Sequence, residues 1–434
     1  MGVAGRSDSE AVRPRVRMRW IVLGAIFLLS FITIVDRVCI SAAKKPMAAE
    51  LQISDEAFGW VFGVFTLGYA LMMVPSGWLA DRFGPGKFLA VIVVLWSVCT
   101  LGTGLATALV PLLAIRFAFG LAEAGAYPAA SRAIYNWFPI GERGVALGLL
   151  NTGGRLGAAF GLPLMSLCIA WVGWRTSYYL LAVVGFAWAI VWVLGFRDRP
   201  RGAAGAAAEG QGGGAAAAVA APAARLSWRH FVRSRNVPLI LLPYFAASFG
   251  YFLCYSWLLP YTKERFGLTD AEAGFCAAIP LCCGALATWL SGVVVDAIYR
   301  RGRWRLSRVL PASAGLAISA VCLVLAPSAT SVGGFIACFA VATFGLDAML
   351  SPSWTVCSDV GRRYTGTLSG AMNTMGSLGA LACSVAFPWL LGATGSIHAF
   401  FYLAAAMNVL GLACWAFLRP DRPLVPDEAE PPSP

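Results

Sequence analysis

The chain has 434 residues, of which 59% are hydrophobic and only 12% are charged, and its mean hydropathy is +0.72. A composition this apolar predicts a membrane protein with many spans and argues against a soluble enzyme. The formal net charge is +12, but the basic residues flank apolar runs, and no basic stripe with interleaved aromatic residues lies elsewhere. We therefore attribute the charge to membrane topology and contact with anionic lipid, and we expect no nucleic-acid partner.

Apolar runs long enough to cross a bilayer as helices recur along the whole chain. They predict an all-α membrane protein with twelve transmembrane helices in two pseudo-symmetric bundles of six. The spans are expected near residues 19–42, 57–80, 86–106, 110–134, 144–169, 175–196, 237–262, 271–298, 308–326, 331–357, 365–391 and 397–418.

A low-complexity segment separates the two predicted bundles. Its centre reads GAAGAAAEGQGGGAAAAVAAPAA, which is too poor in large apolar residues to build a core. We interpret residues 197–236 as a cytoplasmic linker between a first bundle at 19–196 and a second bundle at 237–418. Most of the 33 Lys and Arg residues lie on the side of this linker and the termini. The positive-inside rule therefore predicts cytoplasmic tails at 1–18 and 419–434.

The first apolar run holds two adjacent charges, Asp36 and Arg37, within the stretch FITIVDRVCI. An ionisable side chain at that depth costs roughly 2.5–3.5 kcal/mol on insertion scales, so it faces a bundle interior or a watery cavity. Neighbours on a helix point about 100° apart and cannot simply neutralise each other. Either both residues pair with charges on other helices and only hold the bundle together, or Arg37 binds an anion and Asp36 carries a proton.

The connection between the second and third spans has a near-copy in the second half of the chain. GWLADRFGPGKF at 77–88 and GVVVDAIYRRG at 292–302 each place an Asp four residues after a Gly, which indicates two related halves. Gly77 would let two helices approach closely, and Asp81 would bind backbone donors at the start of the eleventh span, near 365–369. We expect this conformational loop motif to comprise Gly77, Asp81, Arg82, Gly84, Lys87 and Asp296, its basic members binding acidic or carbonyl groups.

These motifs resemble a known family. GWLADRFGPGK is similar to the signature loop of the major facilitator superfamily, and IVDRVCISAA and RFAFGLAEAG resemble its anion:cation symporter family, which includes bacterial sugar-acid and other organic-anion transporters. The resemblance covers nearly the whole chain and implies two six-helix bundles around a central site with alternating access. It also implies that Asp36 and Glu123 are proton-coupling carboxylates. Arg37 matches the ligand of the substrate carboxylate, and Arg116 is linked with Glu123 in that family.

The residues of the fourth span allow a plainer interpretation too. Arg116 and Glu123 are seven apart and lie two turns apart on one helix face. A buried carboxylate between small residues suits a site that loads and unloads a proton. The alternative is a structural network between the two residues with no role in coupling.

Two positions depart from the sugar-acid members of that family. Gly154 stands where those members tend to have Gln, and Ile34 where they tend to have Tyr. Both changes remove polar groups that would match hydroxyls, while Arg155 either adds positive charge to the site or packs between helices. The departures favour a less hydroxylated substrate or a di-acid over a polyhydroxylated sugar acid.

Further substrate contacts are expected from residues that match polar cavity segments of the family, with ordinary helix packing as the alternative for each. With Arg37 and Arg155, the expected substrate-binding residues are Tyr69, Ser351, Ser353, Trp354 and Asn373. Asp347 is also buried by position, and it is either a third titrating group or the partner of a cation.

The sequence lacks the parts of an enzyme. It has no phosphate-binding loop for ATP, no metal-ligand cluster, and only two His residues for a catalytic triad. We therefore expect no cofactor and no metal, with a proton gradient as the driving force. The predicted function is proton-coupled symport of an organic anion, a carboxylate or sugar acid, by a monomer in the bacterial inner membrane. The alternative is a proton-coupled antiporter of drugs or organic cations on the same fold, which Arg37 disfavours.

Overall fold

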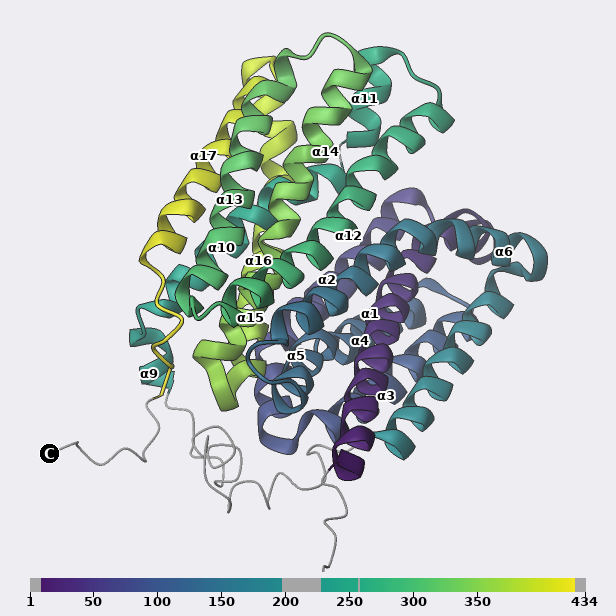
Figure 1. Ribbon diagram of the computed structural model, residues 1–434. Coiled ribbons are helices and arrows are strands. Elements are labelled where there is room, and N and C mark those ends of the chain that lie inside the picture. The colour runs from purple at the N-terminus through teal and green to yellow at the C-terminus, as the bar shows by residue number, and fades with distance from the viewer. Residues whose placement is uncertain (1–8, 197–227, 257, 426–434) are drawn as a thin grey trace, which may run out of the picture.

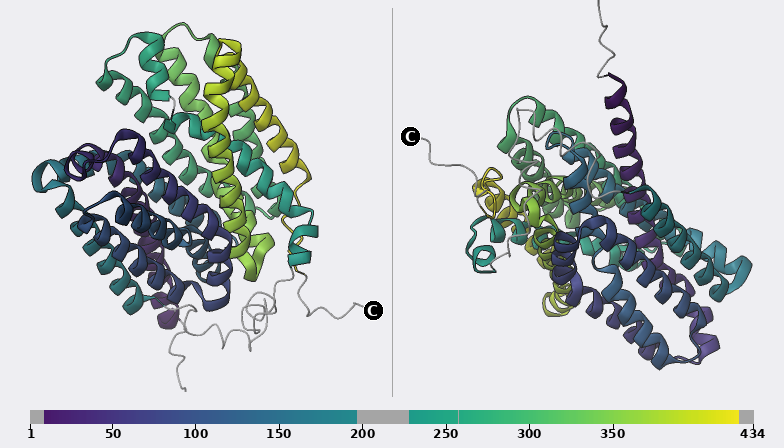
Figure 2. Two further views of the ribbon diagram at one scale, coloured as in Figure 1. Left: turned by 180° about the vertical axis from the view of Figure 1, so that it is seen from behind. Right: turned by 90° about the horizontal axis from the view of Figure 1, so that it is seen from below.

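The computed structural model describes residues 9–196, 228–256 and 258–425 of the chain. These residues form helices joined by short turns, and none of them lies in a strand. Figure 1 shows the helices of the first half of the sequence beside those of the second half, and Figure 2 shows the same arrangement from behind and from below. Most of the predicted linker at 197–236 lies outside the described residues.

The first bundle has six labelled helices, three of which do not correspond one to one with the expected spans. The fourth span is divided into two helices around Ala124 and Gly125. The fifth and sixth spans share one label over 53 residues, but they are two helices separated by a kink at Gly173, where a φ of 79° suits a residue without a Cβ. The helices are α1 (Ser9–Leu51), α2 (Asp55–Phe83), α3 (Pro85–Leu105), α4 (Leu109–Glu123), α5 (Ala126–Trp137) and α6 (Arg143–Gly195).

The second bundle follows the same plan. Its tenth expected span is divided in two at Met349, its seventh is described on either side of residue 257, and short 3-10 turns follow α13 and α15. The helices are α9 (Trp228–Arg233), α10 (Asn236–Ser256), α11 (Leu258–Phe266), α12 (Asp270–Arg300), α13 (Trp304–Leu325), α14 (Val332–Ala348), α15 (Leu350–Gly361), α16 (Thr365–Thr394) and α17 (His398–Phe417).

The surface of the bundles is apolar, as expected for helices in lipid. Among the described residues, nine helical stretches are long and apolar enough to cross a membrane, and two of them, of 53 and 63 residues, are long enough for two crossings each. Large apolar side chains point outward from these helices, and Trp171, Leu194 and Val110 are 84%, 83% and 75% exposed. The chain is therefore a multi-pass helical membrane protein.

Asp81 joins the two bundles near the end of the molecule at which α1 begins and α17 ends (Figure 1). Its carboxylate accepts hydrogen bonds from the backbone amides of Gly366 at 2.9 Å and Thr367 at 2.7 Å, and from the Thr367 hydroxyl at 2.7 Å. These amides belong to the first turn of α16, where unsatisfied N–H groups favour a negative charge. The prediction that Asp81 holds the start of the eleventh span is confirmed.

Asp296 makes the equivalent contact with the bundles exchanged. Its two oxygens accept hydrogen bonds from the amides of Gly144 at 2.9 Å and Val145 at 2.8 Å, in the first turn of α6. The motif glycines make both contacts possible, because a Cβ on Gly77 would lie 2.2 Å from the Gly366 carbonyl oxygen and one on Gly292 would lie 2.4 Å from that of Gly144. We call these two contacts the carboxylate latches.

The basic members of the loop motif behave differently from the expectation. Arg82 and Lys87 are exposed, and within the described residues neither forms an ion pair. The Arg82 guanidinium instead lies over the Trp78 and Phe83 rings, at 5.1 and 5.5 Å from their centroids. Gly84, with a φ of 87°, provides the turn between α2 and α3.

We expect the change Asp81→Asn to open the end of the molecule that carries the latches. Asn keeps the size of the side chain but removes the charge that the α16 N-terminus favours, an effect of about 0.3–1 kcal/mol, or about two- to fivefold in a conformational equilibrium. Asp296→Asn should act in the same direction. The check is labelling of cysteine probes placed on the two faces, with exposed Glu264→Gln as the control. An unchanged labelling ratio in both Asp variants would contradict the role of the latches.

Candidate functional site

A cavity of about 140 Å³ lies between the two bundles. Both halves of the chain contribute to it, through α1, α2, α5 and α6 on one side and α10, α15 and α16 on the other. Its lining residues are Ile34, Arg37, Tyr69, Tyr127, Asn151, Gly154, Arg155, Tyr244, Leu350, Trp354 and Asn373. The structure thus brings together five of the seven residues that the sequence predicts for substrate binding.

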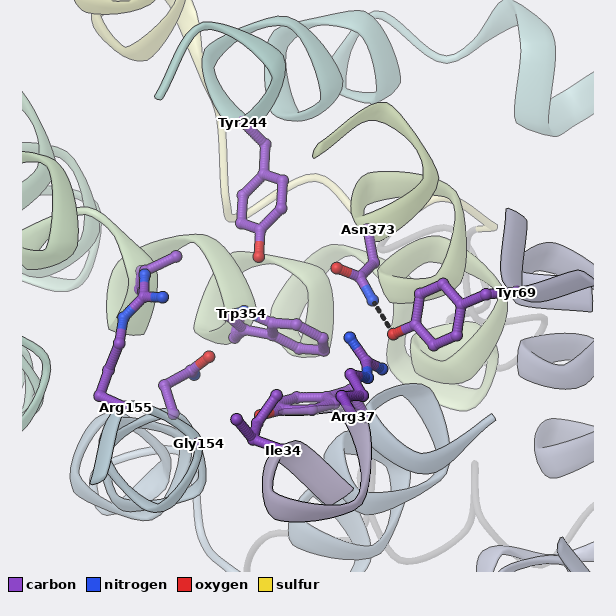
Figure 3. A pocket seen from close by; sticks show the side chains of 11 residues that line it. Ile34, Arg37, Tyr69, Gly154, Arg155, Tyr244, Trp354 and Asn373 are labelled. Atoms are coloured by element: carbon purple, nitrogen blue, oxygen red, sulfur yellow. Dashed lines mark hydrogen bonds between the residues drawn. The ribbon is translucent and has the colours of Figure 1, made fainter. Parts of the chain in front are cut away.

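Arg37 projects from α1 into this cavity (Figure 3). Its Nε donates a hydrogen bond to Glu123 Oε1 at 2.6 Å, and its guanidinium lies 4.2 Å from the centroid of the Tyr69 ring. Nη2 of Arg37 is buried and makes no hydrogen bond to the described residues. The arginine side chain is 25% exposed, whereas that of Glu123 is 1% exposed. The cation therefore faces the cavity, and the anion lies behind it.

Tyr69 and Asn373 connect the two bundles next to Arg37. The Asn373 Nδ2 group donates to the Tyr69 hydroxyl at 3.3 Å, as Figure 3 shows. Trp354 of α15 forms another wall of the cavity and is almost fully buried. Residues from the second bundle therefore complete a site whose charge comes from the first.

The carboxylates expected to carry protons lie close to Arg37, but the pairing differs from the one expected. Glu123 pairs with Arg37 and forms no ion pair with Arg116 among the described residues. The Arg116 guanidinium lies instead over the Phe65 and Phe119 rings, 4.8 and 4.9 Å from their centroids. Asp36 is buried, and its Oδ1 makes no hydrogen bond to the described residues.

Arg155 and Asp347 form a second buried pair, and this pair joins the bundles. Nη2 of Arg155, on α6, lies 2.5 Å from Oδ1 of Asp347, on α14. The guanidinium also lies 3.8 Å from the centroid of the Tyr251 ring on α10. The sequence left the roles of both charged residues open, and the structure shows that Asp347 is the partner of a cation that lines the cavity.

Ser351 and Ser353 do not line the cavity, so the expectation that they bind substrate is not supported. The Ser351 hydroxyl donates to the Gly144 carbonyl at 2.7 Å, and that of Ser353 donates to the Met349 carbonyl at 2.8 Å. Both residues are buried. Their hydroxyls therefore serve the packing of α15 against α6 and the hydrogen bonding of α15 itself.

The two positions that depart from the sugar-acid pattern, Ile34 and Gly154, both face the cavity (Figure 3). A Cβ on Gly154 would lie 2.2 Å from the Tyr127 hydroxyl oxygen, which is also hydrogen bonded to Ser30 Oγ at 2.8 Å. The space of a larger side chain at 154 is thus occupied by Tyr127, a lining residue that sequence reasoning missed. Its spacing of four residues from Glu123 was the available signal, because that spacing puts both on one helix face.

The described residues include no group of three or more side chains suited to hold a metal ion. A helical membrane protein whose two related bundles enclose a positively charged cavity has the structure of a carrier. The sequence model of the Major Facilitator Superfamily matches residues 26–383. The chain belongs to this superfamily, whose members are membrane transporters and not enzymes.

Known relatives and solved structures agree with this assignment. The chain is 31% identical to the "Probable sulfoacetate transporter SauU" of Cupriavidus necator, over 94% of this chain and 96% of the relative. It is 26% identical to the "Probable galactarate/D-glucarate transporter GudP" of Bacillus subtilis, over 95% of each chain. In fold it is similar to the crystal structure of the Major Facilitator Superfamily transporter FucP, with a TM-score of 0.72 at 13% identity over 93% of this chain and 99% of that one.

We predict that Gly154→Ala destabilises the protein and that Tyr127→Phe relieves the effect. The added methyl group would overlap the Tyr127 hydroxyl, and overpacking of this kind typically costs about 1–3 kcal/mol. In the Tyr127→Phe variant that oxygen is absent, so Gly154→Ala should no longer destabilise the protein. Only the higher helix propensity of Ala should then affect stability. The measurement is a double-mutant cycle of thermal stability in detergent. Gly63→Ala, where the methyl group would meet no atom within 4 Å, is the control. If the effects of the two changes on thermal stability were additive, the contact between residue 154 and the Tyr127 hydroxyl would be refuted.

Proposed function

We propose that this protein is a proton-coupled symporter of a small organic anion, working by alternating access. The observation that carries the proposal is Arg37, a cation at membrane depth that faces a cavity shared by the two bundles. An arginine fork can hold a carboxylate or sulfonate through two parallel hydrogen bonds. The buried Nη2 of Arg37, which has no hydrogen-bond partner among the described residues, is available for one of them.

The names of the relatives support an anionic substrate. They include transporters of sulfoacetate, galactarate or D-glucarate, D-galactonate and hexuronate, all of which are organic acids. The cavity supports the same class, because both charged residues among its lining residues, Arg37 and Arg155, are cations. A carrier of organic cations or drugs would favour carboxylates in that position, so the two arginines argue against that alternative.

Proton coupling would follow from the competition between Glu123 and the substrate for Arg37. In the ion pair, Glu123 occupies one edge of the guanidinium. Protonation of Glu123 would weaken that pair and leave Arg37 free for the substrate, so proton and anion binding would favour each other. Asp36 is a buried carboxyl with no ion pair among the described residues, and an uncompensated buried charge is costly, which protonation removes.

The membrane potential makes co-transport of protons useful. An anion that enters a negative cell interior moves against about 2.3 kcal/mol per charge per 100 mV. One proton per negative charge cancels this term, and further protons make uptake favourable. We place the protein in the bacterial inner membrane with both termini in the cytoplasm, and we expect it to act as a monomer.

Arg37→Lys should weaken anion binding at least about tenfold while the protein still folds. Lysine keeps the charge but cannot form the two parallel hydrogen bonds of a guanidinium. The measurement is quenching of tryptophan fluorescence in purified protein by organic acids, since Trp354 lines the cavity. The control is Arg305→Lys, because Arg305 donates to the Ala416 and Leu418 carbonyls away from the cavity. Normal affinity in the Arg37 variant would refute its role.

Glu123→Gln should abolish accumulation driven by a pH gradient and keep exchange of labelled for unlabelled substrate. Gln imitates the protonated carboxyl, so the carrier could still turn over but could not release a proton. We expect the same of Asp36→Asn. Both reactions can be followed in proteoliposomes, with Glu264→Gln as the control. Accumulation at the wild-type level in both variants would mean that these carboxyls are not the coupling groups.

A further inference from the structure

The cavity contains a second cation that the proposed mechanism does not use. Arg37 and Arg155 both belong to the first bundle, and both line the same cavity. Each holds a carboxylate that is more deeply buried than itself, Glu123 at 2.6 Å and Asp347 at 2.5 Å. The Arg155 and Asp347 side chains are 17% and 2% exposed, so here too the cation faces the cavity and the anion lies behind it.

The surface between the two guanidinium groups is uncharged. In Figure 3, Arg155 lies to the left of Arg37, with Trp354, Gly154 and Ile34 between them. The nearby hydroxyl of Tyr127 is already hydrogen bonded to Ser30, and that of Tyr69 accepts from Asn373. The site thus offers two positive ends and an uncharged middle, and several of the polar groups that line it, among them the Tyr69 and Tyr127 hydroxyls, already have partners.

We propose that the substrate is a small dianion with two acidic groups on a short, uncharged spacer. One acidic group binds Arg37, and the other binds Arg155 in place of Asp347. This inference rests on the proposed function and adds to it the substrate class and a specificity role for Arg155. The cavity volume of about 140 Å³ supports a small ligand, since a protein cavity of about 150 Å³ holds a molecule the size of benzene.

Binding at Arg155 has a consequence for Asp347. When an acidic group of the ligand takes its place, the Asp347 carboxylate loses its partner in a buried position, and uptake of one proton removes the uncompensated charge. Arg155 of α6 is the charged group that acts on Asp347 among the described residues. The Tyr251 ring of α10 stacks on that guanidinium. The other helices near Asp347 contribute uncharged residues, since Gly284 of α12 faces the carboxylate and Gly315 of α13 packs against Gly345 of α14. The substrate's second charge is therefore accompanied by a second proton.

The test compares two ligands of nearly equal shape that differ by one charge. Sulfoacetate carries a carboxylate and a sulfonate, whereas methylsulfonylacetate replaces one sulfonate oxygen by a methyl group and is a monoanion. Binding to the purified full-length protein is measured by tryptophan fluorescence between pH 6 and pH 8. We expect the wild type to bind sulfoacetate at least about tenfold more tightly. The affinity of the wild type for sulfoacetate should also fall with rising pH more steeply than its affinity for the monoanion. The difference in slope should correspond to about one proton.

Two variants separate the second cation from general damage to the site. The neutral pair Arg155→Gln with Asp347→Asn leaves no buried charge without a partner, so we expect it to fold and to bind both ligands with equal affinity. The Asp347→Asn variant alone should bind sulfoacetate more tightly than the wild type does at pH 8. In this variant the affinities for the two ligands should depend on pH in the same way. Arg305→Lys is the control and should keep the wild-type preference.

The outcomes distinguish this inference from the proposed function. Equal affinity of the wild type for the two ligands, or a preference that survives in the neutral pair, would overturn the dianion site and leave anion transport intact. Tight binding of D-galactonate without binding of sulfoacetate would have the same meaning. The absence of saturable binding for every one of these acids would overturn the proposed function and the inference together.

Discussion

The centre of this protein depends on the pairing of charges that lie too deep in the membrane to be hydrated by bulk water. Removal of one partner from such a buried pair typically costs about 3–5 kcal/mol, because it leaves the other charge uncompensated. In the cavity, Arg37 relies on Glu123 and Arg155 relies on Asp347. A ligand that is to bind either cation must therefore replace its carboxylate, which ties anion binding to the charge state of these acids.

Much of the fold could be predicted from the sequence, because its signals are local. Apolar length identifies the spans, and the repeated Gly–Asp pattern identifies both latches, including the contact of Asp81 with the start of α16. Helix boundaries were less predictable. Gly173, with a positive φ, separates the fifth and sixth spans by a kink and not by a loop, and the fourth span is divided after Glu123, features that depend on backbone geometry more than on hydropathy.

The partners of the buried charges could not be predicted, because they come from other helices. Spacing along the fourth span suggested that Arg116 pairs with Glu123, yet Arg37 from α1 takes that carboxylate, and Arg116 lies over aromatic rings. Arg155 and Asp347 are 192 residues apart, so no local pattern links them. The motif around Ser351 suggested that its hydroxyl binds substrate. The hydroxyl instead donates to a backbone carbonyl and serves helix packing.

The latches show why a carrier can be held in one conformation without being trapped there. Each consists of a carboxylate and the backbone amides of a helix N-terminus, an interaction of about 0.3–1 kcal/mol that reaches about 2 kcal/mol when partly buried. To invert a two-state equilibrium from 1:99 to 99:1, a ligand needs about 5.5 kcal/mol of differential binding. Two such latches by themselves remain below that value, so the buried ion pairs that also cross between the bundles, Arg143–Asp359 at 3.6 Å and Arg155–Asp347 at 2.5 Å, contribute to holding the bundles together. Arg155 lines the cavity, so substrate and proton binding can break the second of these pairs and thereby influence which end of the molecule is closed.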